Sequence, residues 1–213
     1  MDLARWEEIF EKEISGVASV DDPAHDLLHF RRVVTMSKHL CSLEKGQFET
    51  VVPAAWLHDY VIVPKDSPHR SQASRLSAAK AIEFLKSINY PAEFHEGIFH
   101  AIEGHSFSAN VTISTIEAKI VQDADRLDGL GAIGIARCFA TAGLLKRAFY
   151  NLDDPFCESR TPDDSQFTVD HFFKKLFKTA ETLKTQAGLL EGQHRVKMMK
   201  TYLAALKAEI SPN

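Results

Sequence analysis

The sequence has few cysteines, and none of them forms a metal-binding pair. Its 213 residues include only Cys41, Cys138 and Cys157. An odd number of widely spaced cysteines without a CxxC pair argues against a disulfide framework and against a structural zinc site. We therefore expect free thiols in a reducing compartment, which favours a cytoplasmic protein.

Long apolar runs are also absent. No stretch approaches the roughly 18 apolar residues that a membrane-spanning helix needs. The first residues, MDLARWEEIFEKEI, follow an acidic amphipathic pattern and lack the basic and apolar regions of a signal peptide. The sequence thus predicts no membrane partner.

Neither sign of charge is in large excess. The chain has 25 Lys and Arg residues against 29 Asp and Glu residues, a formal net charge of -4. This balance argues against binding to a nucleic-acid polymer. A small phosphate ester such as a nucleotide stays compatible, because a metal ion and a few local cations can neutralise it. The sequence does not determine the oligomeric state, and a homodimer is compatible with it.

The alternation typical of strands is missing, and helical periodicity dominates instead. The fold class is therefore all-α, and we expect a single-domain helical bundle over residues 1–213. Its core should cover about 20–147, with two C-terminal helices over about 167–210 packed on it. The expected helices cover about 1–14, 21–40, 48–58, 72–87, 91–104, 114–130, 131–146, 168–186 and 190–209. Asn89-Tyr90-Pro91 breaks the chain before the helix at 91, and Ser114 or Thr115 is the candidate N-cap of the helix at 114. The segment 131–146 is either a separate helix or a continuation of the preceding one, bent at the glycines.

The stretch from 149 to about 166 is rich in aspartate and proline and predicts a long loop. Long ordered loops in compact domains are often functional. Phe149, Tyr150, Phe156 and Phe167 offer apolar anchors, so we expect an ordered loop that forms one rim of a substrate pocket. A surface connector remote from the site is the alternative.

Histidines and aspartates recur in an order that suggests a metal site. His29 begins an HxxRV motif, the pair His58-Asp59 ends the apolar segment VVPAAWLHDY, and Asp125 lies in IVQDADRLDGLG. Each of these features alone is weak evidence for a metal site, and it is their order along the chain that indicates one. Imidazole and carboxylate ligands together suit Mn, Fe, Co, Ni or Zn, and Mg less comfortably.

This H…HD…D order resembles the HD-domain metal-dependent phosphohydrolases. The resemblance extends from about residue 20 to about residue 205 and includes HDLLHFRRVV, AAWLHDY, AIEGHSFS and the specific motif DADRLDGLGAIGIAR. These segments are similar to a bacterial subfamily whose relatives act as nucleotide pyrophosphatases. The resemblance therefore implies a helical bundle of the HD-domain type.

Four metal ligands follow from the resemblance, residue by residue: His29, His58, Asp59 and Asp125. They would hold one divalent metal ion, with Mn, Ni, Co, Fe, Zn and Mg as candidates. Such a ligand set leaves coordination positions open for water and a phosphate oxygen, as catalytic sites require.

The implied reaction is hydrolysis of a phosphoester or phosphoanhydride bond. The preferred substrates are nucleoside triphosphates or deoxynucleotides, cleaved to a monophosphate and pyrophosphate. Two alternatives stay open: a phosphomonoesterase, and a catalytically silent nucleotide-binding regulatory domain. A two-iron oxygenase is a third, against which the lack of a second-metal histidine near residues 71–80 argues.

Several residues near the ligands are candidates for other roles. His105 is a candidate phosphate contact or proton donor, or else a histidine bonded to a helix carbonyl. Asp59 is a candidate proton acceptor as well as a ligand. His25 and Asp26 would orient His29 or face the substrate, although Asp26 at a helix N-terminus is also explained by the helix dipole.

Cations follow the His58-Asp59 pair in the segment VIVPKDSPHRSQASRLS. Lys65 and Arg75 are candidate phosphate-binding residues, with His69 and Arg70 nearby. A solvated basic loop is the alternative for all of them.

Overall fold

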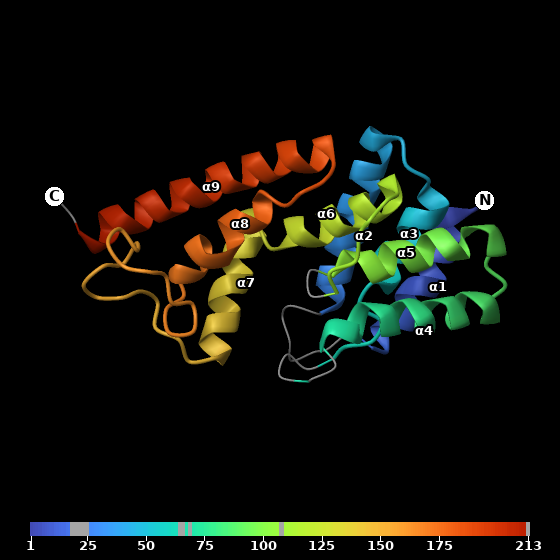
Figure 1. Cartoon of the computed structure of the whole chain (residues 1–213), viewed down its shortest axis with the longest axis horizontal. Coiled ribbons are helices and arrows are strands. Elements are labelled where there is room, and N and C mark those ends of the chain that lie inside the picture. The colour runs from blue at the N-terminus through green and yellow to red at the C-terminus, as the bar shows by residue number, and fades with distance from the viewer. Residues whose placement is uncertain (18–25, 64–66, 68–69, 107–108, 212–213) are drawn as a thin grey trace. The chain divides into compact units, whose positions relative to one another are not determined.

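The computed structural model describes residues 1–17, 26–63, 67, 70–106 and 109–211. These residues are mainly helical and contain no β-strand beyond one isolated bridge, between Ala148 and Phe167. The all-α class predicted from the sequence is confirmed. The helices (Figure 1) are α1 (Leu3–Ser15), α2 (Leu27–Glu44), α3 (Phe48–Leu57), α4 (Ala73–Ser87), α5 (His95–His105), α6 (Ile116–Asp128), α7 (Gly131–Leu144), α8 (Phe177–Ala180) and α9 (Gln186–Ile210).

The chain divides into two compact units. The first comprises Met1–Asp125 together with the short segment Lys184–Ala187, and the second comprises Arg126–Leu183 and Gly188–Asn213. The single domain over the whole chain stays a prediction. Within the described ranges no single helix has the length and apolar character to cross a membrane, and only α6 and α7 taken together, as a bent pair, pass that test.

Helix α3 lies at the centre of the first unit. Its residues from Thr50 to Leu57 are all buried, and α3 contacts α1, α2, α4 and α5. A helix that is apolar on every side must be surrounded by protein. The burial of α3 carries His58, which follows it directly, into the interior.

A proline inside α3 is compensated by a tertiary hydrogen bond. Pro53 has no backbone N–H, so the carbonyl of Glu49 four residues earlier lacks its helical donor. The Tyr90 hydroxyl donates to that carbonyl at 2.7 Å. Tyr90 lies in the Asn89-Tyr90-Pro91 segment, where the sequence predicts a break before the next helix, and Asn89 there has a left-handed φ of 57°.

Helix starts follow their capping residues. Asp26 is the N-cap of α2 and accepts the His29 N–H at 2.7 Å. The expected start of this helix, at about residue 21, lies outside the described residues. Thr115 accepts the Ala118 N–H at the start of α6, as its sequence position predicts. Helix α7 is separate from α6, with α6 ending at Asp128 and α7 beginning at Gly131.

The acidic loop of the second unit has a defined hydrogen-bond pattern. The Asp154 carboxylate accepts the N–H groups of Glu158, Ser159 and Arg160. Arg160 in turn donates two hydrogen bonds, at 2.5 and 2.7 Å, to the fully buried Asp170. These bonds agree with an ordered loop. Phe149 is a weak anchor, because its ring contacts Phe139 but 65% of the residue stays exposed.

The C-terminal helices differ from the expected boundaries. The helix expected over 168–186 is helical only over 170–180, with π-helical hydrogen bonding at Phe172–Leu176. The last helix begins at Gln186, four residues before its expected start. The chain between them makes tertiary hydrogen bonds instead of helical ones, including two from Arg126 to the Thr182 carbonyl and hydroxyl oxygens.

Candidate metal centre

His58 lies at the C-terminal end of α3 and is fully buried. Its Nδ1 atom lies 2.8 Å from the Ala55 carbonyl oxygen. A carbonyl only accepts hydrogen bonds, so Nδ1 carries a proton and the lone pair of the neutral ring lies on Nε2. The buried end of α3 thus presents Nε2 as a metal-binding atom.

His29 reaches the same point from the first turn of α2. Its Nε2 atom lies 3.3 Å from Nε2 of His58. The N-cap hydrogen bond from the His29 N–H to Asp26 fixes the start of the helix that carries this ring. Asp26 therefore supports His29 through the backbone, at the helix N-terminus where its charge is also favourable, and a contact between Asp26 and substrate stays a prediction.

Two carboxylates complete the cluster. Asp125 Oδ1 lies 3.6 Å from Nε2 of His29 and 3.9 Å from Nε2 of His58. Asp59 Oδ2 lies 3.6 Å from Nε2 of His58. The structure thus brings together all four residues that the resemblance implies as ligands, in the region formed by α2, α3 and α6.

The donor set fits a divalent cation. In sites with bonds of about 2.1 Å, neighbouring donor atoms lie roughly 3.0–3.4 Å apart. The observed separations of 3.3–3.9 Å are only slightly wider. Two carboxylates also supply negative charge against a dication, and imidazole nitrogens add borderline ligands. The side chains present could therefore hold a metal ion such as Mn²⁺, Co²⁺ or Zn²⁺.

His105 joins the cluster on the other side of Asp59. It ends α5, is buried, and lies with Nε2 3.4 Å from Asp59 Oδ1. Its Nδ1 atom lies 2.6 Å from the Ile102 carbonyl oxygen, so Nδ1 holds a proton and Nε2 is the exchangeable position. The helix-carbonyl bond, weighed from the sequence as an alternative role, thus coexists with a place in the cluster.

Burial and charge affect the two inner histidines differently. Burial lowers the pKa of His58 to about 4, in spite of the Asp59 carboxylate nearby. Burial also disfavours charge on His105, but its hydrogen bond to Asp59 and the Asp59 and Asp125 charges outweigh this, and the pKa of His105 is raised. His58 is therefore neutral at pH 7, as a metal ligand must be.

The expected phosphate-binding cations are not brought to the cluster by any described contact. Arg75 is exposed and lies 3.6 Å from Glu103. This pairing fits the solvated alternative, and its role in substrate binding stays a prediction. His25 and Lys65, together with His69, lie outside the described residues.

The sequence motif DADRLD contains two further acids with structural partners. Asp123 is fully buried and accepts the N–H groups of Lys184 and Thr185. Asp128 pairs with Arg137 at 2.6 Å. Two residues along a helix correspond to a turn of about 200°, so Asp123 and Asp125 point to nearly opposite sides. The spacing of two residues in the sequence therefore indicates that Asp123 and Asp125 have different partners.

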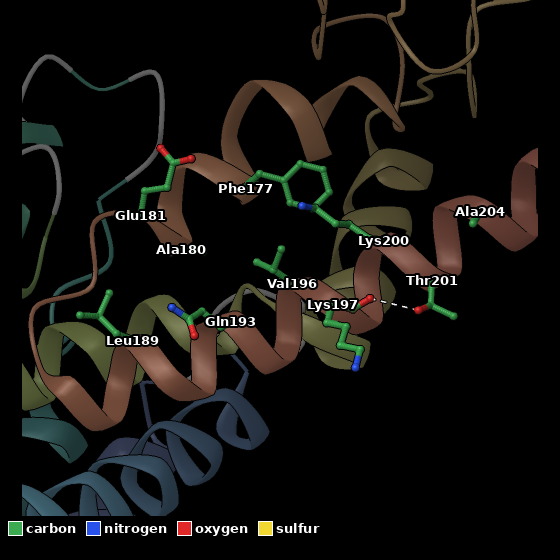
Figure 2. Close-up of a pocket in the computed structure, with 10 residues that line it drawn as sticks. All are labelled: Phe177, Ala180, Glu181, Leu189, Gln193, Val196, Lys197, Lys200, Thr201 and Ala204. Atoms are coloured by element: carbon green, nitrogen blue, oxygen red, sulfur yellow. Dashed lines mark hydrogen bonds between the residues drawn. The ribbon is translucent and has the colours of Figure 1, made fainter.

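An apolar groove lies elsewhere, in the second unit, between α8 and α9 (Figure 2). None of the clustered histidines and aspartates lines it. Lys200 Nζ there lies 5.9 Å from the centre of the Phe177 ring. The groove is lined by Phe177, Ala180, Glu181, Leu189, Gln193, Val196, Lys197, Lys200, Thr201 and Ala204.

The HD domain family matches residues 27–130. This range contains every clustered side chain and ends well before the C-terminal helices.

Similar proteins resemble nearly the whole chain. The uncharacterized protein YpgQ of Bacillus subtilis is 27% identical over 201 residues, which cover 92% of this chain and 90% of that protein. The crystal structure of an HD-superfamily hydrolase from Bacillus thuringiensis is 30% identical, with a TM-score of 0.72 and coverage of 97% and 98%. The structure of Bacillus subtilis YpgQ in complex with ADP is 29% identical, with a TM-score of 0.73 and coverage of 95% and 98%.

Proposed function

This chain belongs to the HD superfamily of hydrolases, and from that premise we propose that it hydrolyses phosphoester or phosphoanhydride bonds with one divalent metal ion. The observation that carries the proposal is a pair of metal-ligand groups that share the buried His58: His29, His58 and Asp125 form one, and His58, Asp59 and His105 form the other. When bound, the metal supplies Lewis-acid chemistry: it polarises a phosphoryl group and makes water more acidic.

The protein's own part begins with holding the ligand atoms in place. The carbonyl bond at Nδ1 of His58 keeps its Nε2 lone pair directed at the cluster. Such partners fix the tautomer and the ring orientation of a ligating histidine, and their loss typically weakens metal binding roughly 10–100-fold. The buried position of His58 also excludes water from that side.

Asp59 and His105 are the candidate proton-transfer pair. One oxygen of Asp59 is directed to His58 and the other to His105. We assign Nε2 of His105 as the atom that gives a proton to the leaving-group oxygen, because Nδ1 is engaged by Ile102. The Asp59 carboxylate stabilises the protonated ring before transfer and can accept a proton from water.

A nucleotide is the substrate class we favour, with cleavage of nucleoside triphosphates or deoxynucleotides to a monophosphate and pyrophosphate. The support is the complex of the similar protein YpgQ with ADP. ADP carries a phosphoanhydride, so a related site in this chain would meet the same kind of bond. No described residue of this chain specifies the base or the sugar.

A substrate panel tests the proposal. Nucleoside mono-, di- and triphosphates, deoxynucleotides and simple phosphomonoesters would each be incubated with the metal-free protein and with added Mg²⁺, Mn²⁺, Co²⁺ or Ni²⁺. We expect metal-dependent release of pyrophosphate from triphosphates, detected by ion chromatography. Release of phosphate from monoesters alone would instead identify a phosphomonoesterase. Tight nucleotide binding without turnover would identify a regulatory domain.

A further inference from the structure

A short segment distant in sequence belongs to the unit that contains the metal-site residues. Residues Lys184–Ala187 are part of the first unit, although the chain on either side of them belongs to the second. They lead into α9 and lie outside the range matched by the HD domain family. This segment therefore joins α9 to the unit that contains the metal-site residues.

Its first contact is with α6. The Asp123 carboxylate accepts the Lys184 N–H at 2.8 Å and the Thr185 N–H at 2.7 Å, and it also accepts the Thr185 hydroxyl at 2.7 Å. Both Asp123 and Thr185 are buried. A buried carboxylate needs such donors, because an uncompensated charge in the interior is strongly unfavourable.

Its second contact is with α2. The side chain of Glu44, the last residue of α2, accepts the Ala187 N–H at 2.6 Å. The N–H groups at the start of a helix have no partner within the helix, and carboxylates there are favoured by the helix dipole. Glu44 fills this role for Ala187 in the first turn of α9, while Asp123 of α6 accepts the two N–H groups that directly precede the helix.

Helices α2 and α6 are the ones that carry His29 and Asp125. His29 lies in the first turn of α2, and Asp125 lies two residues after Asp123 in α6. The separation between His29 Nε2 and Asp125 Oδ1 is 3.6 Å. A metal site needs its donor atoms at narrow spacings, so whatever fixes α2 against α6 also affects metal affinity.

We propose that the start of α9 is a positioning element for the metal centre. Asp123 and Thr185 together with Glu44 hold α2 and α6 at the spacing that lets His29 and Asp125 share one cation. None of the three belongs to the groups of side chains that could hold a metal ion, so they are positioning residues rather than ligands. This inference rests on the proposed metal site and adds a C-terminal determinant of its affinity.

Thr185→Val gives the sharpest test. The substitution is nearly isosteric, removes the hydroxyl donor to Asp123 and keeps the backbone N–H. Binding of Mn²⁺ alone to the metal-free, full-length protein would be measured by isothermal titration calorimetry, with urea unfolding measured in parallel. We expect the dissociation constant to rise roughly 3–10-fold for Thr185→Val and 10–100-fold for Asp123→Asn, the range for residues that support a ligand. Thr185→Ser, which restores a hydroxyl, should bind nearly as the wild type.

Thr168→Val is the matched control. Thr168 is another buried threonine whose hydroxyl donates a hydrogen bond, to the Ala148 carbonyl in the second unit. Its loss should reduce stability but leave Mn²⁺ affinity unchanged. Equal affinity of the wild type and folded Thr185→Val would overturn the inference, even if Asp123→Asn fails to fold. No Mn²⁺ binding by the wild type itself would overturn the proposed function and, with it, this inference.

Discussion

Replacing Asp125 with Asn separates metal binding from folding. The substitution keeps the shape of the side chain and removes one negative ligand. Asp125 is partly exposed, with 29% of its side chain accessible, so we expect the free energy of unfolding of the metal-free protein to change by less than about 1 kcal/mol. Metal affinity should fall at least about 100-fold, because loss of a partner behind a ligand alone costs roughly 10–100-fold.

That loss corresponds to about 3 kcal/mol of binding free energy, at about 1.4 kcal/mol per tenfold change. Calorimetric titration with Mn²⁺ or Co²⁺ would measure it directly. Metal content after dialysis and far-UV circular dichroism would show that the variant is folded but metal-poor. Turnover should fall with metal occupancy.

Asp128→Asn is the matched control in the same helix. Asp128 is buried and paired with Arg137 at 2.6 Å, so its loss should cost roughly 1–3 kcal/mol of stability. Its metal affinity should stay within about threefold of the wild type, a smaller change than loss of a ligand-supporting partner gives. The two variants are thus expected to show opposite patterns. Wild-type metal affinity in Asp125→Asn would refute the assignment of Asp125 as a ligand.

The roles of His105, His58 and the loop over residues 149–166 are each tested by a separate experiment. His105→Ala should keep metal content near normal and reduce turnover roughly 10²–10⁴-fold, and loss of metal from this variant would identify His105 as a ligand instead. Acidification of the metal-free protein from pH 6.5 to 4 should remove up to about 3 kcal/mol of its free energy of unfolding through His58. The folded pKa of His58, about 4, lies below the unfolded value of 6.5, so the unfolded chain binds more protons in this window. Urea unfolding at several pH values should therefore show a steeper pH dependence for the wild type than for His58→Asn, and equal slopes would contradict this. Hydrogen exchange with a non-hydrolysable nucleotide should increase protection over residues 149–166, and unchanged protection there beside newly protected metal-site helices would exclude the loop from the mechanism.

Local sequence signals predicted the elements around the cluster well. The ends of α3 and α4 follow from apolar periodicity and from the Asn89-Tyr90-Pro91 break, and the order of His29, His58-Asp59 and Asp125 led to the cluster itself. In these segments the local preference of the sequence for helix and the pattern of buried residues point to the same helices. Burial of α3 on every side then places His58 in the interior without further information.

Local sequence patterns could not predict the tertiary contacts. The helix expected to continue to residue 186 ends near Ala180, where Arg126 and Asp123 bond to the following segment. Helical periodicity cannot reveal such bonds, because their donors and acceptors are about 60 positions apart in the chain. The contact between Arg75 and Glu103 was likewise invisible to local sequence signals, and the role of Lys65 and Arg75 in phosphate binding stays a prediction.

Metal-dependent release of phosphate or pyrophosphate from nucleotides tests the central claim most directly. The protein would be stripped of metal, titrated with Mn²⁺ or Co²⁺, and assayed at each step with a nucleoside triphosphate. Metal-dependent hydrolysis predicts no product from the stripped protein and product formation that rises until one metal is bound per chain. Turnover that persists without metal, or its absence from a fully loaded wild type across the substrate panel, would contradict the account.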